Sequence, residues 1–527
     1  MADLKRFQQV SEAPTRPATQ QQKQAFDVAD LYRGPLGDAK PDADEQAPLD
    51  EKLRQAYFWI TNHAIISPFY DIEYNDKPPQ VYTIGDQKVR ISLPTGQSYS
   101  SYVLLPLLNL AVRRRCLLVG GPGRGKTAIT ILMGVLAGYS LRDVKRSIQH
   151  GQPQMTISDL LGNPLPSTLV NAESMEDVKI AWRKWLGMRV KVIDEYNRIP
   201  TRTQSALLTV MADNYAELFD QIYECPEAAW YLTANDDAGG GTYQVIEALR
   251  DRIDIVVAAM HFNTRFLEEL LLRIEAGVRP EQVVPKQIVF TEAELDRIQR
   301  GILDVRVPAA IRRRLEFFAS HFEFFEPAAR QLEYMTKDTV KLAGIEFHTL
   351  AGSESGKDTV KDLGGQTRNG LSVRAFMTTL IYIKALAYFR GEQVAHIEDV
   401  RQILPFVLHD KLVQNPDAPY FEHPGNGAYR SDQVSWIREL FDLSCKEFER
   451  LSLDNDDPVA ALEQEFASGL KGVSEREVRK RLTAIERTLD EWARGRKFYG
   501  HMFDDILKLK YLHQRYSNYL RWLKWES

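Results

Sequence analysis

The sequence predicts an α/β protein with a parallel sheet at its core, an N-terminal extension before the sheet and helical regions after it. Between Arg115 and Met260, continuous apolar runs of strand length alternate with longer segments of helical periodicity. Such runs suit strands covered on both faces, and the alternation with helices is typical of a parallel sheet. After about His261 only helical patterns follow. The strand-like runs are CLLVG (116–120), VKVID (190–194), AAWYLTA (228–234) and DIVVAAM (254–260).

The part of the chain before the sheet divides into a tail and an extension. Residues 1–48 are rich in Gln, Ala, Pro, Asp and Lys, so they cannot bury enough apolar surface to fold alone. Residues 49–100 contain a segment of helical spacing at 50–66 and two strand-like runs, QVYTI and KVRISL, around a Gly-Asp turn. We therefore expect a flexible tail at 1–48 and an extension at 49–100 that packs on a core at 101–262.

Two helical regions are expected after the core. The first covers 263–412 and is interrupted around 325–369 by a polar, Gly-rich stretch that predicts a loop or a small insertion. The second covers 413–527, where charges alternate heavily and aromatic residues are frequent near the end. Helical hairpins or a coiled coil would fit this second pattern.

The composition argues against several classes of protein. The net charge of −5 gives no global field that favours nucleic acid or an anionic membrane. No stretch approaches the roughly 18 apolar residues of a membrane helix, and the opening residues MADLKRFQQV lack the apolar core of a signal peptide. The three cysteines form no CxxC pair, which argues against a disulfide framework or a structural zinc site. We expect a cytoplasmic protein without membrane insertion.

A phosphate-binding loop is predicted where the first strand ends. Residues 120–127 satisfy G-x-x-x-x-G-K-[ST] in full, and a strand before them and a helical segment after them argue against an unrelated glycine-rich turn. The glycines allow a tight turn that exposes backbone N–H groups to phosphate oxygens. Lys126 reaches the β- and γ-phosphates, and Thr127 binds Mg²⁺, so the predicted cofactors are ATP and Mg²⁺. The predicted nucleotide-binding residues are Gly120, Gly121, Pro122, Gly123, Arg124, Gly125, Lys126, Thr127 and Ala128.

Polar residues end two further strands. Asp194 is expected to hold Mg²⁺ through water, and Glu195 to polarise the water that attacks ATP. Lys191 interrupts the apolar run of that strand, which predicts a charged stem near a sheet edge or the surface. Asn235 ends the next run, where its amide can both donate and accept hydrogen bonds between the nucleotide and the water. The alternative for Asn235 is a loop-initiating asparagine.

Three blocks of sequence, in the same order, resemble the MoxR branch of the AAA+ ATPases. DEYNRIPTRTQSALLTVMAD (194–213) is similar to the D-E-I-N-R-x-x-x-x-x-Q-x-A-L-L-x-x-M pattern of that branch, and NDDAGGGTYQVIEALRDRID (235–254) to its next block, although no proline follows the asparagine. Residues 370–412 are similar to the helical lid of the family. The resemblance covers about residues 100–412 and implies a P-loop AAA+ sheet core with a helical lid. Added helices around the lid are typical of a RavA-like subgroup.

The resemblance also implies a homo-hexameric ring in which a neighbouring subunit completes the site. Arg252 would be the arginine finger that reaches the neighbour's γ-phosphate, and Arg250 is a second candidate. Arg374 matches the sensor-2 position, which would couple the nucleotide state to the lid angle. For any one of these arginines the alternative is a surface salt bridge of little energetic value. The segments 152–177 and 213–227 take the place of two insertions that touch substrate.

Members of this family usually act as chaperone-like remodellers of proteins, often with a partner that carries a von Willebrand factor A domain. The resemblance therefore implies an ATPase that drives remodelling, activation or metal-cofactor insertion of a client protein. A nucleic-acid-translocating or restriction-type motor is the alternative, but it would need a basic pore insertion, and 152–177 is of mixed charge. A regulatory nucleotide-binding scaffold would lack Glu195 or the finger arginine. The aromatic C-terminal helices could dock nucleic acid or a protein, or form an ordinary amphipathic pack.

Overall fold

The chain folds into two compact units. The first comprises Met1–Arg306 and Leu380–Gln402, and the second comprises Val307–Thr379 and Ile403–Ser527. The computed structural model describes residues 48–85, 89–169, 178–235, 245–277, 279–350, 362–455, 457–495, 498 and 500–526. The predicted tail at 1–48, except its last residue, and parts of the predicted insertions therefore lie outside the described residues.

A five-stranded parallel sheet forms the core of the first unit and confirms the predicted α/β class. The strand order is β13–β5–β12–β9–β6, so β12 separates β5 from β9. Four strands coincide with the predicted apolar runs, but the short strand β6 carries no apolar pattern and was missed. The strands are β5 (Arg115–Val119), β6 (Gln149–His150), β9 (Val190–Asp194), β12 (Ala229–Ala234) and β13 (Ile255–Ala258).

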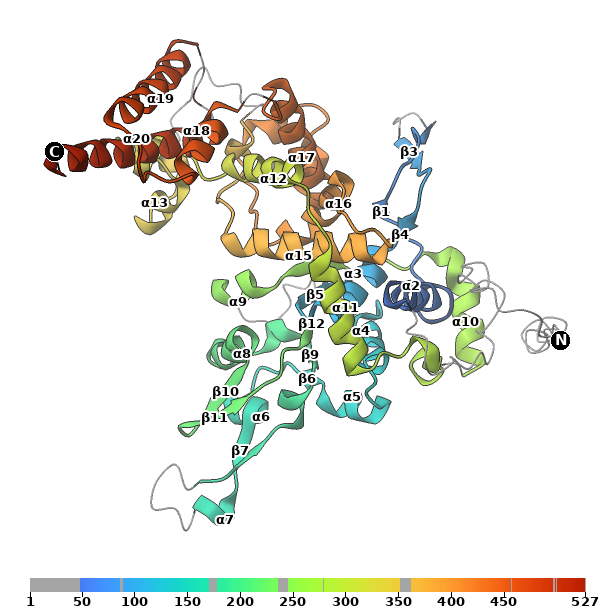
Figure 1. Cartoon of the computed structure of the whole chain (residues 1–527). Helices are drawn as coiled ribbons and strands as arrows, with labels where there is room; N and C mark the ends of the chain where they lie inside the picture. Colours follow the sequence, from blue (N-terminus) through green and yellow to red (C-terminus); the bar gives the residue numbers. More distant parts are fainter. Residues whose placement is uncertain are drawn as a thin grey trace, which may run out of the picture. The chain divides into compact units, whose positions relative to one another are not determined.

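Helices and short antiparallel strand pairs surround this sheet in the first unit (Figure 1). The helices are α2 (Leu49–Trp59), α3 (Ser101–Val112), α4 (Lys126–Leu136), α5 (Leu141–Ser147), α6 (Ile157–Leu161), α7 (Pro166–Leu169), α8 (Thr201–Asp213), α9 (Glu247–Arg252), α10 (Leu267–Glu275) and α11 (Glu292–Asp304). The strand pairs are β1 (Ile72–Glu73) with β4 (Ser98–Tyr99), β2 (Gln80–Ile84) with β3 (Val89–Leu93), β7 (Gly162–Pro164) with β8 (Ile180–Trp182), and β10 (Tyr215–Leu218) with β11 (Gln221–Glu224). The strand β7 and the pair β10–β11 lie in the segments predicted as insertions, whereas β8 follows the first of these segments.

Both faces of the sheet are covered, which explains why β12 is apolar at successive positions. Side chains along a strand point alternately to opposite faces. Trp230 and Leu232 join a buried cluster with residues of α6 and α8, whereas the Tyr231 hydroxyl donates to Pro106 O in α3 at 2.8 Å. The helix α3 is buried along its whole length. The helices on both faces fix the ends of the strands, and these ends in turn position the polar residues that follow them.

The position of Lys191 corrects the sequence-based expectation of a charged stem at an edge or surface. Lys191 is 1% exposed in β9, which lies between β12 and β6. Its Nζ donates to Met188 O and lies 5.7 Å from the centre of the Trp230 ring. Burial lowers the pKa of Lys191 to about 8. A lysine can occupy this apolar position because its methylene groups pack against apolar neighbours, while its ammonium contacts a backbone carbonyl and the face of an aromatic ring.

Helices form the second unit in the ranges that are described, in agreement with the predicted helical C-terminal region. They are α12 (Ala309–Ser320), α13 (Lys337–Leu342), α14 (Phe347–Leu350), α17 (Gln433–Arg450), α18 (Pro458–Ala467), α19 (Glu475–Gly495) and α20 (Gly500–Glu526), together with the start of α15 (Val373–Phe389) and the end of α16 (Ile397–Leu408). The three last helices of the chain share an apolar core that includes Val478, Ile485, Leu512 and Tyr516.

Part of the Gly-rich stretch around 325–369 is folded rather than a plain loop. The helices α13 and α14 lie within it, and the buried Lys337 donates to Gly364 O at 2.7 Å and to Thr367 O at 2.8 Å. Residues 351–361 are outside the described part. Both helices are short and the stretch as a whole is polar and Gly-rich, which is why its composition predicted a loop or a small insertion.

Candidate functional site

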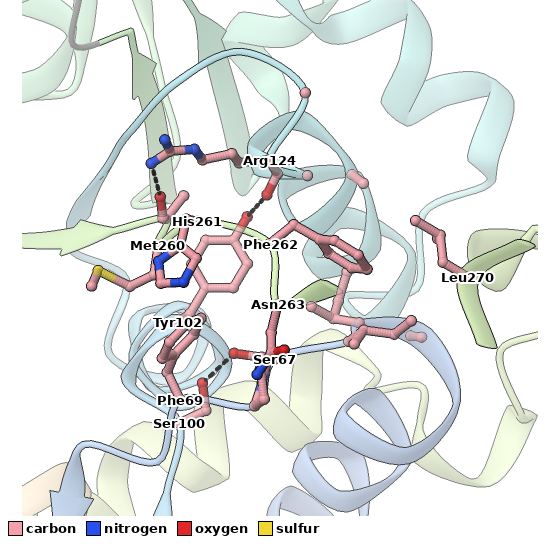
Figure 2. A pocket seen from close by; sticks show the side chains of 18 of the residues that line it. Ser67, Phe69, Ser100, Tyr102, Arg124, Met260, His261, Phe262, Asn263 and Leu270 are labelled. Carbon is pink, nitrogen blue, oxygen red and sulfur yellow. Dashed lines mark hydrogen bonds between the residues drawn. The ribbon is translucent and has the colours of Figure 1, made fainter. Parts of the chain in front are cut away.

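The phosphate-binding loop connects β5 to α4, and its glycines are required by its shape. Gly123 and Gly125 have φ values of 73° and 80°, in the left-handed region that favours glycine. The loop is braced from two sides: Arg124 Nη1 donates to Ala259 O at 3.0 Å, and the Tyr102 hydroxyl donates to Arg124 O at 3.2 Å (Figure 2). A braced loop can present its backbone N–H groups without further ordering, which suits an anion site.

Lys126 is buried and folds its ammonium over the loop. Its Nζ donates to Gly120 O, to Gly121 O at 2.8 Å and to Asn235 Oδ1 at 3.0 Å. The positive charge is therefore held beside the loop, where phosphate oxygens are predicted to bind. Charge-assisted hydrogen bonds of an ammonium to phosphate are stronger than those to neutral carbonyls, so phosphate can take over these donors.

Thr127 and Asp194 meet although they come from different elements. The Thr127 hydroxyl, on the first turn of α4, donates to Asp194 Oδ1 at the end of β9 over 3.0 Å. A hydroxyl and a carboxylate are hard oxygen ligands of the kind that Mg²⁺ takes alongside phosphate oxygens and water. The pair fits the predicted Mg²⁺ site.

Glu195 follows Asp194 in an unusual backbone conformation. Its φ of 54° lies in the left-handed region, which is uncommon for a residue other than glycine. Its N–H donates to the Thr233 hydroxyl at 2.9 Å, and that hydroxyl in turn donates to Asp194 Oδ1 at 2.6 Å. The buried Thr233 thus holds both consecutive acidic residues, and sequence reasoning missed it. Only the strand order, which places β12 beside β9, brings it there.

Asn235 links the lysine to the second carboxylate. Its Oδ1 accepts from Lys126, and its Nδ2 donates to Glu195 Oε1 at 2.7 Å. The other oxygen of Glu195 lies 3.2 Å from Arg198 Nε. One amide therefore contacts both the ammonium and the carboxylate, and its role between nucleotide and water stays a prediction.

The predicted arginines lie on other elements. Arg250 is exposed in α9, and Arg252 at the end of that helix donates to Ala248 O over 3.3 Å. Arg374 is exposed near the start of α15, in the part of that helix that belongs to the second unit. The roles assigned to these three side chains stay predictions.

A cavity of about 370 Å³ borders the phosphate-binding loop (Figure 2). The backbone segment 64–69, the start of α3, residues 258–263, α10 and Gly123–Gly125 form its walls. Phe69 and His261 meet edge to face with ring centroids 5.3 Å apart, and Tyr102 and Phe262 add further aromatic surface. Sequence reasoning missed this cavity because its walls come from distant segments that carry no motif.

The chain is similar to several known proteins. Residues 115–255 match the family described as "ATPase family associated with various cellular activities (AAA)", and residues 365–424 match the AAA lid domain. Chaperone MoxR1 of Mycobacterium tuberculosis is 25% identical over 316 residues, which is 59% of this chain and 71% of the relative. A crystal structure from Cytophaga hutchinsonii, of a protein assigned as an ATPase, is matched with a TM-score of 0.44 and 17% identity over 64% of this chain and 89% of that chain. Within the described ranges, no helix has both the length and the apolar character needed to cross a membrane.

Proposed function

Because the chain belongs to the AAA+ ATPases of the MoxR type, we propose that it hydrolyses ATP at the Lys126–Asp194–Glu195 site and uses the free energy to remodel a partner protein. One observation carries the first half of the proposal. A continuous chain of hydrogen bonds joins Lys126, Asn235 and Glu195, while Thr127, Asp194 and Thr233 form a second chain beside it. These side chains come from α4 and from the ends of neighbouring strands, so the fold aligns them around one place.

ATP would bind with its phosphates on the loop and its base in the adjoining cavity. The volume of about 370 Å³ lies in the range of small-molecule pockets, and the aromatic walls suit a flat heterocycle. Gly123–Gly125 belong both to the loop and to the cavity wall, so a single ligand can occupy the two. The whole predicted set Gly120–Ala128 would then contact the nucleotide.

Hydrolysis needs a positioned water and stabilised charge. Glu195 would accept a proton from the water as its oxygen attacks the γ-phosphorus, and the bond to the ADP oxygen breaks. Asn235 holds the Glu195 carboxylate in place for this proton transfer. Lys126 would stabilise the charge on the phosphate oxygens, and Thr127 and Asp194 would hold Mg²⁺, which neutralises further charge when bound.

Assembly into a homo-hexamer would complete the site. An exposed or half-exposed arginine such as Arg252, or Arg250 two residues earlier, can reach a neighbouring subunit's γ-phosphate. Arg374 would relate the nucleotide state to the lid. The partner would be a cytoplasmic client protein, with a von Willebrand factor A domain protein as a second partner. Chaperone MoxR1 supports a remodelling role through its name alone.

Particle mass and ATP turnover, measured across a range of chain concentrations with and without ATP and Mg²⁺, test this proposal. We expect a ring that forms or tightens with nucleotide and a turnover per chain that rises with assembly. Lys126→Ala is the control and should abolish turnover. A monomer whose turnover per chain is independent of chain concentration would contradict the ring mechanism. If DNA added to the same assay raises turnover and added protein does not, the translocase alternative is favoured.

A further inference from the structure

A second cavity, of about 600 Å³, lies beside β6, the edge strand of the central sheet. It differs from the cavity next to the phosphate-binding loop because its walls are polar and cationic. Arg146, Arg183 and Lys184 line it, and Asp159 is the carboxylate in its wall. Nothing in the hydrolysis mechanism uses this cavity.

The charges of this cavity are only partly compensated. Lys184 pairs with Asp143 at 2.7 Å, and Asp159 Oδ2 is occupied by the backbone and hydroxyl of Thr156. Arg146 and Arg183 are exposed, and no carboxylate of the described residues lies within salt-bridge distance of either. Two guanidinium groups are therefore available to a ligand, and their planar forks match carboxylates in particular.

The size and the lining favour an acidic polypeptide over nucleic acid. A volume of about 600 Å³ holds several side chains. Nucleic-acid affinity relies on about six to ten phosphate contacts or on exposed aromatic rings for base stacking. Here Arg146, Arg183 and Lys184 are too few for such contacts. Of the two aromatic rings in the wall, Trp185 is 1% exposed and the His150 imidazole lies against Asp194.

The cavity adjoins the hydrolysis site through two consecutive residues. His150 lines the cavity, pairs with Asp194 in the sheet, and has its Nδ1 3.3 Å from Asp194 Oδ2. The next N–H, of Gly151, donates to Asp194 O at 2.7 Å. A Cβ on Gly151 would lie 2.1 Å from Glu195 O. The backbone of Gly151 is therefore packed directly against the backbone of Glu195. A ligand that shifts this segment must also shift the acidic pair.

We propose that this cavity binds an acidic segment of the partner protein and that its occupancy is coupled to the nucleotide state through His150 and Gly151. The inference rests on the proposed function in that it names where the partner of the ATPase binds. Coupling between two sites is reciprocal, so ATP must change the affinity for the acidic segment by the same factor that the segment changes the affinity for ATP.

The binding test uses the full chain, without nucleotide, and a fluorescein-labelled oligoglutamate peptide as the probe. Arg146→Glu together with Arg183→Glu should weaken binding about tenfold or more, because like charges then face the probe. Arg142→Glu is the control. Arg142 lies on α5, as Arg146 does, but it is exposed and outside the cavity wall, so this variant should bind the probe as the wild type does. Basal ATP turnover should be unchanged in both variants. Equal binding by the double variant and the control would overturn the site, and so would tighter binding of an oligothymidylate of equal charge.

The coupling test compares the same probe on Glu195→Gln with and without saturating ATP and Mg²⁺. A change of about threefold or more in its dissociation constant is expected for coupling between adjacent sites, and an unchanged constant would remove the coupling. Failure of the proposed function is distinguishable from failure of the site. A chain that binds oligoglutamate but never hydrolyses ATP would sink the ATPase proposal alone.

Discussion

The Thr233 hydroxyl donates to Asp194 Oδ1 at 2.6 Å and accepts from the Glu195 N–H at 2.9 Å, so one buried side chain holds the two acidic residues of the site. The left-handed backbone at Glu195, with φ of 54°, depends on this contact because such a conformation needs support from its surroundings.

Thr233→Val should lower kcat by about ten- to a hundredfold and weaken the apparent affinity for Mg²⁺, because the support of Asp194 and Glu195 is lost while the volume is kept. The cost to the free energy of unfolding should be about 1–3 kcal/mol, since polar groups are left unsatisfied. Turnover against Mg²⁺ concentration measures the effect. Thr233→Ser keeps the hydroxyl and should recover most of the activity; equal losses in both variants would mean that the methyl contact matters instead.

Asn235→Ala should slow hydrolysis by about a hundredfold with little loss of ATP binding. The amide bridges Lys126 and Glu195, and its removal frees the Glu195 carboxylate without removing the phosphate donors. Single-turnover kinetics and binding of a fluorescent ATP analogue separate the two steps. A purely loop-initiating asparagine would instead alter stability and leave the rate per bound nucleotide intact.

Arg252→Ala should bind ATP and lower kcat by about a thousandfold, as expected for an arginine supplied by a neighbour. Mixing this variant with Lys126→Ala provides the decisive control. An Arg252→Ala subunit keeps its lysine, and its Lys126→Ala neighbour keeps the finger, so mixed rings should regain turnover that neither variant shows alone. No recovery in mixed rings would argue against a finger in trans, and the same mixture with Arg250→Ala tests the second candidate.

Gly151→Ala should disturb hydrolysis through the backbone. A Cβ at this position would lie 2.1 Å from Glu195 O, so the segment must shift. We expect a loss of about 1–3 kcal/mol in the free energy of unfolding, as for overpacking, together with a reduced kcat. Gly427→Ala is the matched control, because the nearest atom to its Cβ would be 3.9 Å away and no activity change is expected. Normal turnover in Gly151→Ala would show that the turn at Glu195 tolerates displacement.

Lys191→Met should flatten the pH dependence of stability between about pH 8 and 10.5. The pKa of Lys191 is lowered by burial from 10.5 to about 8, so in this window the unfolded chain binds more protons than the folded one, and stability rises with pH. The pKa shift corresponds to about 3 kcal/mol in the free energy of unfolding. This stabilisation is fully present above pH 10.5 and is lost as the pH falls through 8. Thermal melts of both proteins across this range measure the difference. Parallel curves would show that Lys191 titrates normally.

Local patterns in the chain were sufficient for most of the fold and for the first residues of the site. Apolar runs of strand length predicted four of the five sheet strands, and the glycine spacing of 120–127 predicted the loop between β5 and α4. Both signals lie within a few consecutive residues. The strand β6 was missed because a strand of two polar residues leaves no period to detect.

The amino-acid sequence alone specified which residue types stand at the strand ends and the glycine loop, and three blocks of it (194–213, 235–254 and 370–412) resemble the MoxR branch of the AAA+ ATPases. The folded chain was needed to show that Thr233 lies against Asp194, that Lys191 is buried, and that two cavities flank the site. The reason is physical. Motifs depend on spacing along one segment, whereas these contacts depend on strand order and on packing between segments that are far apart in sequence, and periodicity carries no record of either.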